Sequence, residues 1–316
     1  MSFSVSEKDY LYQSLSSKTP IRPDGRKSHQ LRGIEASINF LPNSNGSSRI
    51  RLSDGSEVII SIKSKVVKMS TLADLIELDL TIDNLRDDLT FISDWTNILR
   101  NSLLRNFADK FECLKLTTRY YFKLYVDVLF LSSSSNARTT KTDTSFLQNP
   151  LSMISFGIYL ALKSTRLPLL ISNSNDKDIE ELPTFNDDWS STVLLYPQDE
   201  DEEIKENNTT SQNSSSPPLL FVLSVVKNNL FIDPSIEEQE ISDCGLVIGW
   251  CSGKVVSPIE SLNLNQSGSS EYIKGMHGQN IIEGIKMIEN VAATVSKGLD
   301  EIVKDGNNSV FMDSIF

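Results

Sequence analysis

Three arginines lie close together near the start of the chain, in the stretch TPIRPDGRKSHQLR that covers residues 19–32. The guanidinium groups of Arg22 and Arg26 can form paired hydrogen bonds with carboxylates, phosphates or carbonyl oxygens. Between them lies Pro23-Asp24-Gly25, a sequence typical of a tight turn. This chemistry suits either a functional site or a structural motif that fixes the N-terminal segment. The residues alone leave both interpretations open.

A second group of cations alternates with aromatic residues over positions 119–127. Arg119, Tyr121, Lys123 and Tyr125 would share one face of a strand. Cations interleaved with aromatic rings suit a surface that follows an RNA backbone without reading its sequence. Arg and Tyr are also enriched at subunit interfaces, and we favour the interface for this face.

Another basic strip follows a predicted hairpin and contains Lys63, Lys65 and Lys68. Lysines often protect exposed sheet edges, so a solvated strand end explains this strip equally well. Four residues from the two basic groups are the candidates for RNA contact: Lys63, Lys65, Arg119 and Lys123.

Other catalytic or metal-binding patterns are missing from the sequence. His29 and His277 are far apart and do not have the spacing of a zinc-binding helical pair. The three cysteines are scattered, and the chain contains neither a P-loop nor a Gly-x-Ser-x-Gly motif. We therefore predict no cofactor, no metal site and no catalytic residue.

The composition narrows the class of protein. The 316 residues are 39% apolar and 23% charged, and the N-terminus does not resemble a secretory signal. We expect a soluble intracellular protein that does not associate with a membrane.

The net charge of −12 argues against a protein that coats nucleic acid by itself. Much of that charge lies in residues 198–208, QDEDEEIKENN, within a predicted flexible loop over 197–217. The polar segment 133–148 is a second predicted flexible loop.

Hydrophobic periodicity predicts strands and helices in an α+β order. In the first part, a helix capped by Ser6 ends at Leu15, and a hairpin turns at Asp54-Gly55. Helical spacing follows over 92–107, and period-two spacing over 120–128. The segment after Pro150 is apolar nearly all round, which predicts a buried helix.

The second part repeats this order of strands followed by a helix. A strand is predicted over 191–196, and hairpins at 227–229 and at Ser252-Gly253. A long helix follows, with one apolar stripe that contains Ile281, Ile285, Ile288, Ala292, Val295, Leu299 and Ile302. Together the two parts indicate α+β architecture in which one unit is loosely used twice.

Three motifs in this order resemble the RNase PH family, in particular the ring subunits of the eukaryotic RNA exosome. They are RPDGR before the hairpin GSSRIRLSDGSEVIISIKSKV, the run PLLFVLSVVKNNLFIDPSIEEQE, and GLVIGWCSGKVVSPIES. The turn Asp233-Pro234, with the glutamates after it, is characteristic of the exosome branch. The resemblance implies one RNase PH-like domain over 1–305, with halves of about 20–166 and 167–305, and a tail over 306–316. It also favours a structural role for Arg22, Asp24 and Arg26.

The resemblance implies the partners as well. We expect paralogous RNase PH-like subunits in a hexameric ring, S1/KH cap proteins, a separate catalytic nuclease and single-stranded RNA in a central channel. We also expect the protein in the nucleus and nucleolus, and in the cytoplasm.

Phosphorolytic members of the family need a phosphate cradle at a Gly-rich helix entrance and acidic residues near the leaving oxygen. Here Arg138-Thr139 lies in a long polar segment without a neighbouring glycine. Asp233 matches the acidic residues of those enzymes only in part. We therefore predict a non-catalytic ring subunit. A phosphorolytic 3′–5′ exoribonuclease and a free-standing interaction scaffold are the alternatives.

Overall fold

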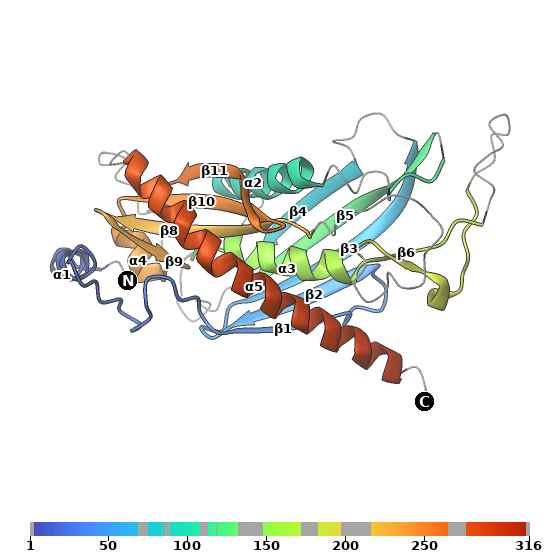
Figure 1. Ribbon diagram of the computed structural model, residues 1–316, viewed down its shortest axis with the longest axis horizontal. Helices are drawn as coiled ribbons and strands as arrows, with labels where there is room; N and C mark the ends of the chain where they lie inside the picture. The colour runs from blue at the N-terminus through green and yellow to red at the C-terminus, as the bar shows by residue number, and fades with distance from the viewer. Residues whose placement is uncertain are drawn as a thin grey trace.

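Two β-sheets with helices packed between them form the body of the protein in the computed structural model (Figure 1). The structure describes residues 3–68, 75–83, 85, 89–107, 113–117, 119–131, 148–171, 183–196, 216–264 and 276–313. The predicted α+β class is confirmed. The helices are α1 (Val5–Leu15), α2 (Thr90–Asn106), α3 (Leu151–Ser164), α4 (Ile236–Ile241) and α5 (Gly278–Asp313), with a short 3-10 helix η5 (Trp189–Ser191).

The first sheet has five strands in the order β1-β2-β3-β5-β4. Its side chains alternate along each strand, so one face packs on the helices and the other is the outer face. Neighbours pair antiparallel except β4 and β5, which are parallel. The predicted turn at Asp54-Gly55 is confirmed, because Gly55 has a φ of 87° there. The strands are β1 (Ile34–Ile38), β2 (Gly46–Leu52), β3 (Glu57–Lys68), β4 (Ile76–Ile82) and β5 (Tyr120–Leu131).

The second sheet has four strands in the order β11-β10-β8-β9. They are β8 (Leu219–Val226), β9 (Asn229–Ile232), β10 (Cys244–Cys251) and β11 (Lys254–Leu262). The strand β9 is short and leaves the first residues of β8 without a strand on that side. There the hydroxyls of Ser152 and Ser155 on α3 accept hydrogen bonds from the backbone N–H groups of Val222 and Leu220, each at 2.8 Å. The helix thus completes the hydrogen bonding of a buried strand edge.

Helix α3 is the buried helix that the sequence predicts after Pro150. It packs on β2 and β3 of the first sheet and on β8 of the second, and nearly all its residues are buried. Gly157 lets it approach β3, since a Cβ atom there would lie 2.6 Å from the Cδ1 atom of Ile60. Ser48 on β2 donates a hydrogen bond to the Gly157 carbonyl at 2.7 Å. Helix α2, whose predicted apolar face is buried, packs on β4 and β11.

Helix α5 crosses the four-stranded sheet and β1 (Figure 1). Most of its predicted apolar stripe is buried or half-buried against the core, and Ile288, Ala292 and Leu299 are fully buried. The helix runs to Asp313, whereas the sequence predicts that a tail begins at residue 306. The described residues contain no helix that is long and apolar enough to cross a membrane.

Several local predictions are wrong. The cap of α1 is Ser4 rather than Ser6, because Ser4 and Glu7 form a reciprocal capping box. Helix α4 was not predicted, and it forms because Ser235 and Glu238 make a second capping box after the Asp233-Pro234 turn. The strand predicted over 191–196 is only β7 (Val193–Leu194), which pairs with β6 (Arg166–Leu167).

Most of the two predicted loops, 133–148 and 197–217, lies outside the described residues. The last residue of the first loop, Gln148, is described and is buried, as is Pro217 at the end of the second loop. Both residues therefore belong to the packed structure, and each loop prediction extends too far toward its C-terminal end.

Candidate nucleic-acid interface

The predicted cations of β3 and β5 lie together on the outer face of the five-stranded sheet. In the antiparallel register, Lys65 is directly opposite Lys123, and Lys63 is opposite Tyr125. Between them along the strands, Leu124 on β5 is buried and Ser64 on β3 is half-buried, so these four side chains point outward. The alternation of cations and rings predicted for one strand thus extends across two strands.

Lys123 is held by groups on its own sheet. Its ammonium nitrogen is 2.7 Å from the Oε2 atom of Glu77, a residue of β4, and 4.9 Å from the centre of the Tyr125 ring. The hydrogen bond and the charge of Glu77 raise the pKa of Lys123 above its ordinary value. Because like charges directly opposite each other destabilise a sheet, Glu77 also offsets the repulsion between Lys65 and Lys123.

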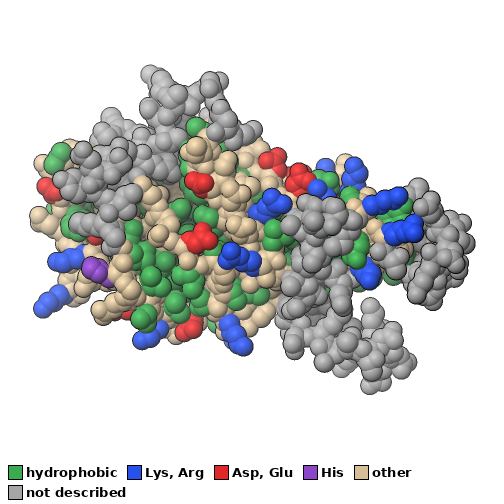
Figure 2. Space-filling model, turned by 90° about the horizontal axis from the view of Figure 1, so that it is seen from above, with side chains coloured by type: hydrophobic (Ala, Val, Ile, Leu, Met, Phe, Trp, Pro, Cys, Tyr) green, Lys and Arg blue, Asp and Glu red, His purple; other side chains and the backbone are tan. Residues whose placement is uncertain are grey.

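The remaining cations of this region lie where β3 ends and β5 begins. Arg119 is exposed just before the first residue of β5. Lys68, the last residue of β3, has its ammonium 5.7 Å from the centre of the Tyr120 ring. Figure 2 shows Lys and Arg side chains gathered toward the end of the molecule to which these strands extend. We call Lys63, Lys65, Lys68, Arg119 and Lys123 the basic surface.

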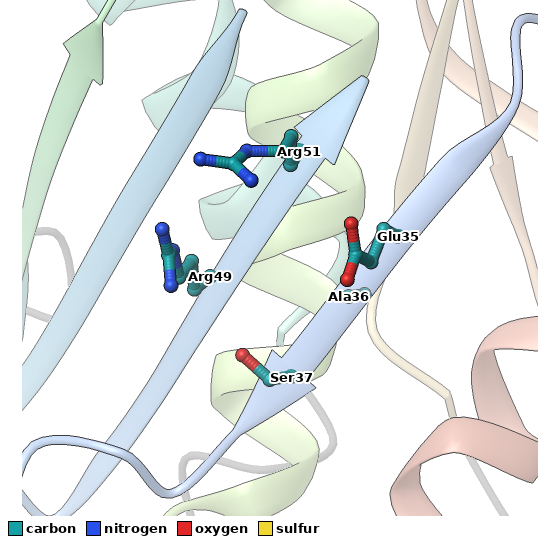
Figure 3. Close-up of a pocket in the computed structure, with 5 residues that line it drawn as sticks. All are labelled: Glu35, Ala36, Ser37, Arg49 and Arg51. Carbon is teal, nitrogen blue, oxygen red and sulfur yellow. The ribbon is translucent and has the colours of Figure 1, made fainter. Parts of the chain in front are cut away.

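Farther along the outer face, the cations are neutralised by neighbouring carboxylates. Arg49 and Arg51 on β2 both contact Glu57 on β3, at 2.5 and 3.5 Å. Figure 3 shows these arginines projecting from β2 and Glu35 projecting from β1. They line a pocket of about 80 Å³. Since each arginine has a carboxylate close by, this part of the face attracts a polyanion less strongly than the basic surface does.

The family resemblance predicts that a phosphate cradle, if there were one, would lie at the entrance of α3. Here the backbone N–H of Leu151 donates to the side-chain oxygen of Asn149 at 3.0 Å. The N–H of Asn149 donates to the Gln239 side chain at 3.1 Å, and Gln148 donates to the Pro234 carbonyl at 2.6 Å. These amide side chains are buried at the entrance, where they bind the N–H groups of Asn149 and Leu151. Arg138-Thr139 lies outside the described residues.

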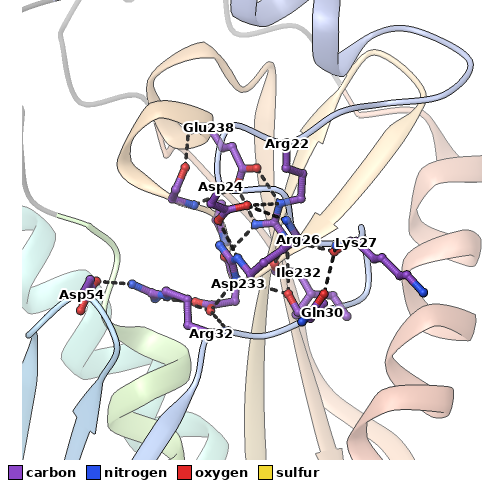
Figure 4. A network of polar contacts seen from close by, with 12 residues as sticks. Arg22, Asp24, Arg26, Lys27, Gln30, Arg32, Asp54, Ile232, Asp233 and Glu238 are labelled. Carbon is purple, nitrogen blue, oxygen red and sulfur yellow. Dashed lines mark hydrogen bonds and ion pairs between the residues drawn. The ribbon is translucent and has the colours of Figure 1, made fainter.

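Arg22 of the RPDGR motif is buried in the structure (Figure 4). Its guanidinium donates to both carboxylate oxygens of Glu238 on α4, at 2.6 and 2.7 Å. It also donates to four backbone carbonyls, those of Lys27, Gln30, Ile232 and Asp233. The arginine therefore fastens the N-terminal segment to the corner between β9 and α4.

Arg26 and Arg32 converge on the carboxylate of Asp233 (Figure 4). Arg26 lies 3.1 Å from it and also binds Asp24 at 2.6 Å, whereas Arg32 donates to both Asp233 oxygens. Burial raises the pKa of Asp233, but the hydrogen bonds and charge of Arg32 outweigh it, and the pKa lies below its usual value. The residue adopts a positive φ of 51° at this turn.

Arg32 joins four segments of the chain at one point. Besides Asp233, its guanidinium binds Asp54 in the β2–β3 turn at 2.5 Å and the Gln148 side chain at 2.6 Å. Sequence reasoning singled out Arg22, Asp24 and Arg26 but missed Arg32, Glu238 and Gln148. Their partners are distant in the sequence, so no local spacing could have indicated them.

Comparisons with known proteins were made for the whole chain. No family model matches it. The chain is 42% identical over 302 residues to "Exosome complex component RRP42" of Saccharomyces cerevisiae, covering 96% of this chain and 100% of that protein. It is 28% identical over 275 residues to the Schizosaccharomyces pombe protein of the same description, covering 81% of each. Among solved structures, it resembles the archaeal exosome core with a TM-score of 0.64 at 17% identity, over 93% of this chain and 96% of the other.

Proposed function

The chain belongs to the family of the exosome component RRP42, and on that premise we propose that it is a non-catalytic structural subunit of an RNA exosome ring. In this role it contributes to the path of RNA during 3′–5′ processing and degradation, including rRNA maturation. The RNase PH-like fold, which it shares with the archaeal exosome core, supports this function.

The main support for a non-catalytic role is the set of buried amide side chains at the entrance of α3. A phosphate nucleophile would need free backbone N–H groups and the positive end of the helix dipole. The N–H groups of Asn149 and Leu151 are bound to amide oxygens of the chain. Asp233, the candidate acid, is held by Arg26 and Arg32 and is not available as a general acid.

The basic surface supports the RNA-contacting part of the proposal. Its lysines neighbour tyrosine rings, and both groups suit sequence-independent contact with single-stranded RNA. The partners we propose are paralogous RNase PH-like subunits in a hexameric ring, S1/KH cap proteins and a separate catalytic nuclease. A location in the nucleus, the nucleolus and the cytoplasm belongs to the same proposal.

The test is a phosphorolysis assay on the purified chain and on the reconstituted ring without a dedicated nuclease. Each is incubated with single-stranded RNA and inorganic phosphate, and nucleoside diphosphates are measured. We expect none above background. Release of diphosphates that is lost in Arg138→Ala or Asp233→Ala would overturn the non-catalytic role in favour of a phosphorolytic exoribonuclease.

The native mass of the protein purified from cells addresses the other alternative. A ring subunit is recovered in a complex with paralogous chains, and we expect that result. Recovery as a monomer, with no paralogous chains attached, would favour a free-standing interaction scaffold.

A further inference from the structure

The cations of the basic surface differ in what they are bound to. Lys123 is paired with Glu77 at 2.7 Å, whereas Lys63 and Lys65 are exposed and form no ion pair within the described part of the chain. Glu77 remains largely exposed, with 57% of its side chain accessible. The carboxylate therefore lies at the surface, where an RNA phosphate that approached Lys123 would meet it.

This geometry makes Glu77 a competitor for RNA. A phosphate that approaches Lys123 is repelled by a carboxylate that already holds the ammonium in a charge-assisted hydrogen bond at 2.7 Å. The same ammonium lies 4.9 Å from the centre of the Tyr125 ring, so Lys123 is held by both the carboxylate and the ring. Lys63, directly opposite Tyr125, is free to take a phosphate beside that ring.

We propose that Glu77 determines how tightly the basic surface holds RNA, by occupying Lys123 and leaving the ionic contacts to Lys63 and Lys65. This inference rests on the proposed RNA-contacting function and adds a residue that weakens the contact. Weak ionic contact suits a surface along which a strand has to move, because each bound phosphate must also be released.

The experiment measures the salt dependence of RNA binding by the intact complex, purified from cells in which the variant replaces the natural chain. The probe is a fluorescent single-stranded oligouridylate, titrated at several salt concentrations. For single strands, each neutralised phosphate contributes about 0.7 to the slope of log affinity against log salt. Glu77→Gln frees Lys123, so we expect the slope to steepen by about 0.7.

The affinity itself should change in the same direction. Glu77→Gln should bind the probe more tightly than the natural complex at low salt. That advantage should shrink about 2.6-fold when salt is raised from about 50 to about 200 mM, as one added phosphate contact requires. Glu77→Ala should behave in the same way, and native mass spectrometry checks that both variants assemble.

Asp79→Asn is the matched control. Asp79 lies two residues farther along β4 on the same face, and no ion pair joins it to a cation in the described ranges. Its substitution removes the same charge without freeing a lysine, so the slope should stay unchanged. Lys123→Met, combined with Glu77→Gln, should abolish the increase in slope.

The outcomes separate this inference from the function on which it rests. If the double variant Lys63→Gln/Lys65→Gln leaves RNA affinity and slope unchanged, the basic surface does not contact RNA. The RNA-contacting part of the proposed function and the role of Glu77 are then both wrong. If the double lysine variant lowers the slope by about 1.4 but Glu77→Gln behaves like Asp79→Asn, only the role of Glu77 is wrong.

Discussion

At the scale of single residues, the buried pair of Arg22 and Glu238 connects the start of the chain to its second half. The exposed fractions are 2% for Arg22 and 0% for Glu238. Removing one member of such a pair leaves a buried charge without a partner. We therefore expect Glu238→Ala to lower the free energy of unfolding by about 3–5 kcal/mol, as measured by urea denaturation.

The exposed pair of Arg49 and Glu57 provides the control for that measurement. The Arg49 side chain is 44% exposed, so water already solvates much of the charge. Arg49→Ala should therefore lower the free energy of unfolding much less than Glu238→Ala does. Equal losses in the two variants would show that burial does not set the strength of the Arg22–Glu238 pair.

Asp233 should make the stability depend on pH in the acid range. Its folded-state pKa is lowered by Arg32 despite the opposing effect of burial, so its ionised form stabilises the fold. That contribution is present above about pH 4, the usual range of an aspartate, and is lost as the pH falls through the lowered pKa. The difference in free energy of unfolding between the natural chain and Asp233→Asn should therefore narrow below about pH 4. A difference that stays constant down to low pH would contradict this role.

Single residues were the least predictable part of the protein. The sequence indicated that Arg22 and Arg26 bind carboxylates or carbonyls, and both do. It did not indicate Glu238 or Asp233 as their partners, because these lie about two hundred positions away. Glu77 was missed for the same reason, since it reaches Lys123 only through the parallel pairing of β4 with β5.

At the scale of elements, close approach between β2 and the end of α3 depends on Gly46. A Cβ atom at this position would lie 2.6 Å from the Ala161 carbonyl oxygen and 2.8 Å from the Thr165 Cα atom. Backbone atoms cannot move aside as a flexible side chain does. Gly46→Ala should therefore lower the free energy of unfolding by about 1–3 kcal/mol, measured by urea denaturation.

Gly298 in α5 is the matched position with the opposite expectation. No atom lies within 4 Å of the place where its Cβ would be, and the residue is exposed within a helix. Gly298→Ala should raise the free energy of unfolding by up to about 1 kcal/mol, because alanine favours the helix. Destabilisation at Gly298 would mean that a group packs there in solution.

Elements were predictable where periodicity was long and regular. The apolar faces of α2, α3 and β5 are buried as their spacing indicates. Short elements were not predictable in this way. Helix α4 has only six residues, and it depends on a capping box and on Arg22. The parallel pairing of β4 with β5 requires α2 to cross between them, and the spacing of apolar residues does not encode that pairing.

At the scale of the whole molecule, the two sheets are joined by the helices between them and by one polar connection at the entrance of α3. Gln148 is the centre of that connection, because it accepts from Arg32 and donates to the Pro234 carbonyl. The sequence predicted two sheets and a buried helix but placed Gln148 in a loop. A single glutamine at the end of a polar stretch has no pattern that marks it as buried.

This connection leads to a test with two deletions that differ by a few residues. Replacing residues 134–146 with a short Gly/Ser linker should change the free energy of unfolding by less than about 1 kcal/mol, because loop closure depends weakly on length. The polar composition of the segment also predicts no contribution to the core. Extending the replacement through Gln148 leaves Arg32 and the Pro234 carbonyl without that partner. It should lower the free energy of unfolding by about a further 1–3 kcal/mol. Urea denaturation of both variants measures the difference. Equal stability would show that Gln148 does not join the halves, and a large loss in the shorter replacement would show that residues 134–146 pack as part of the fold.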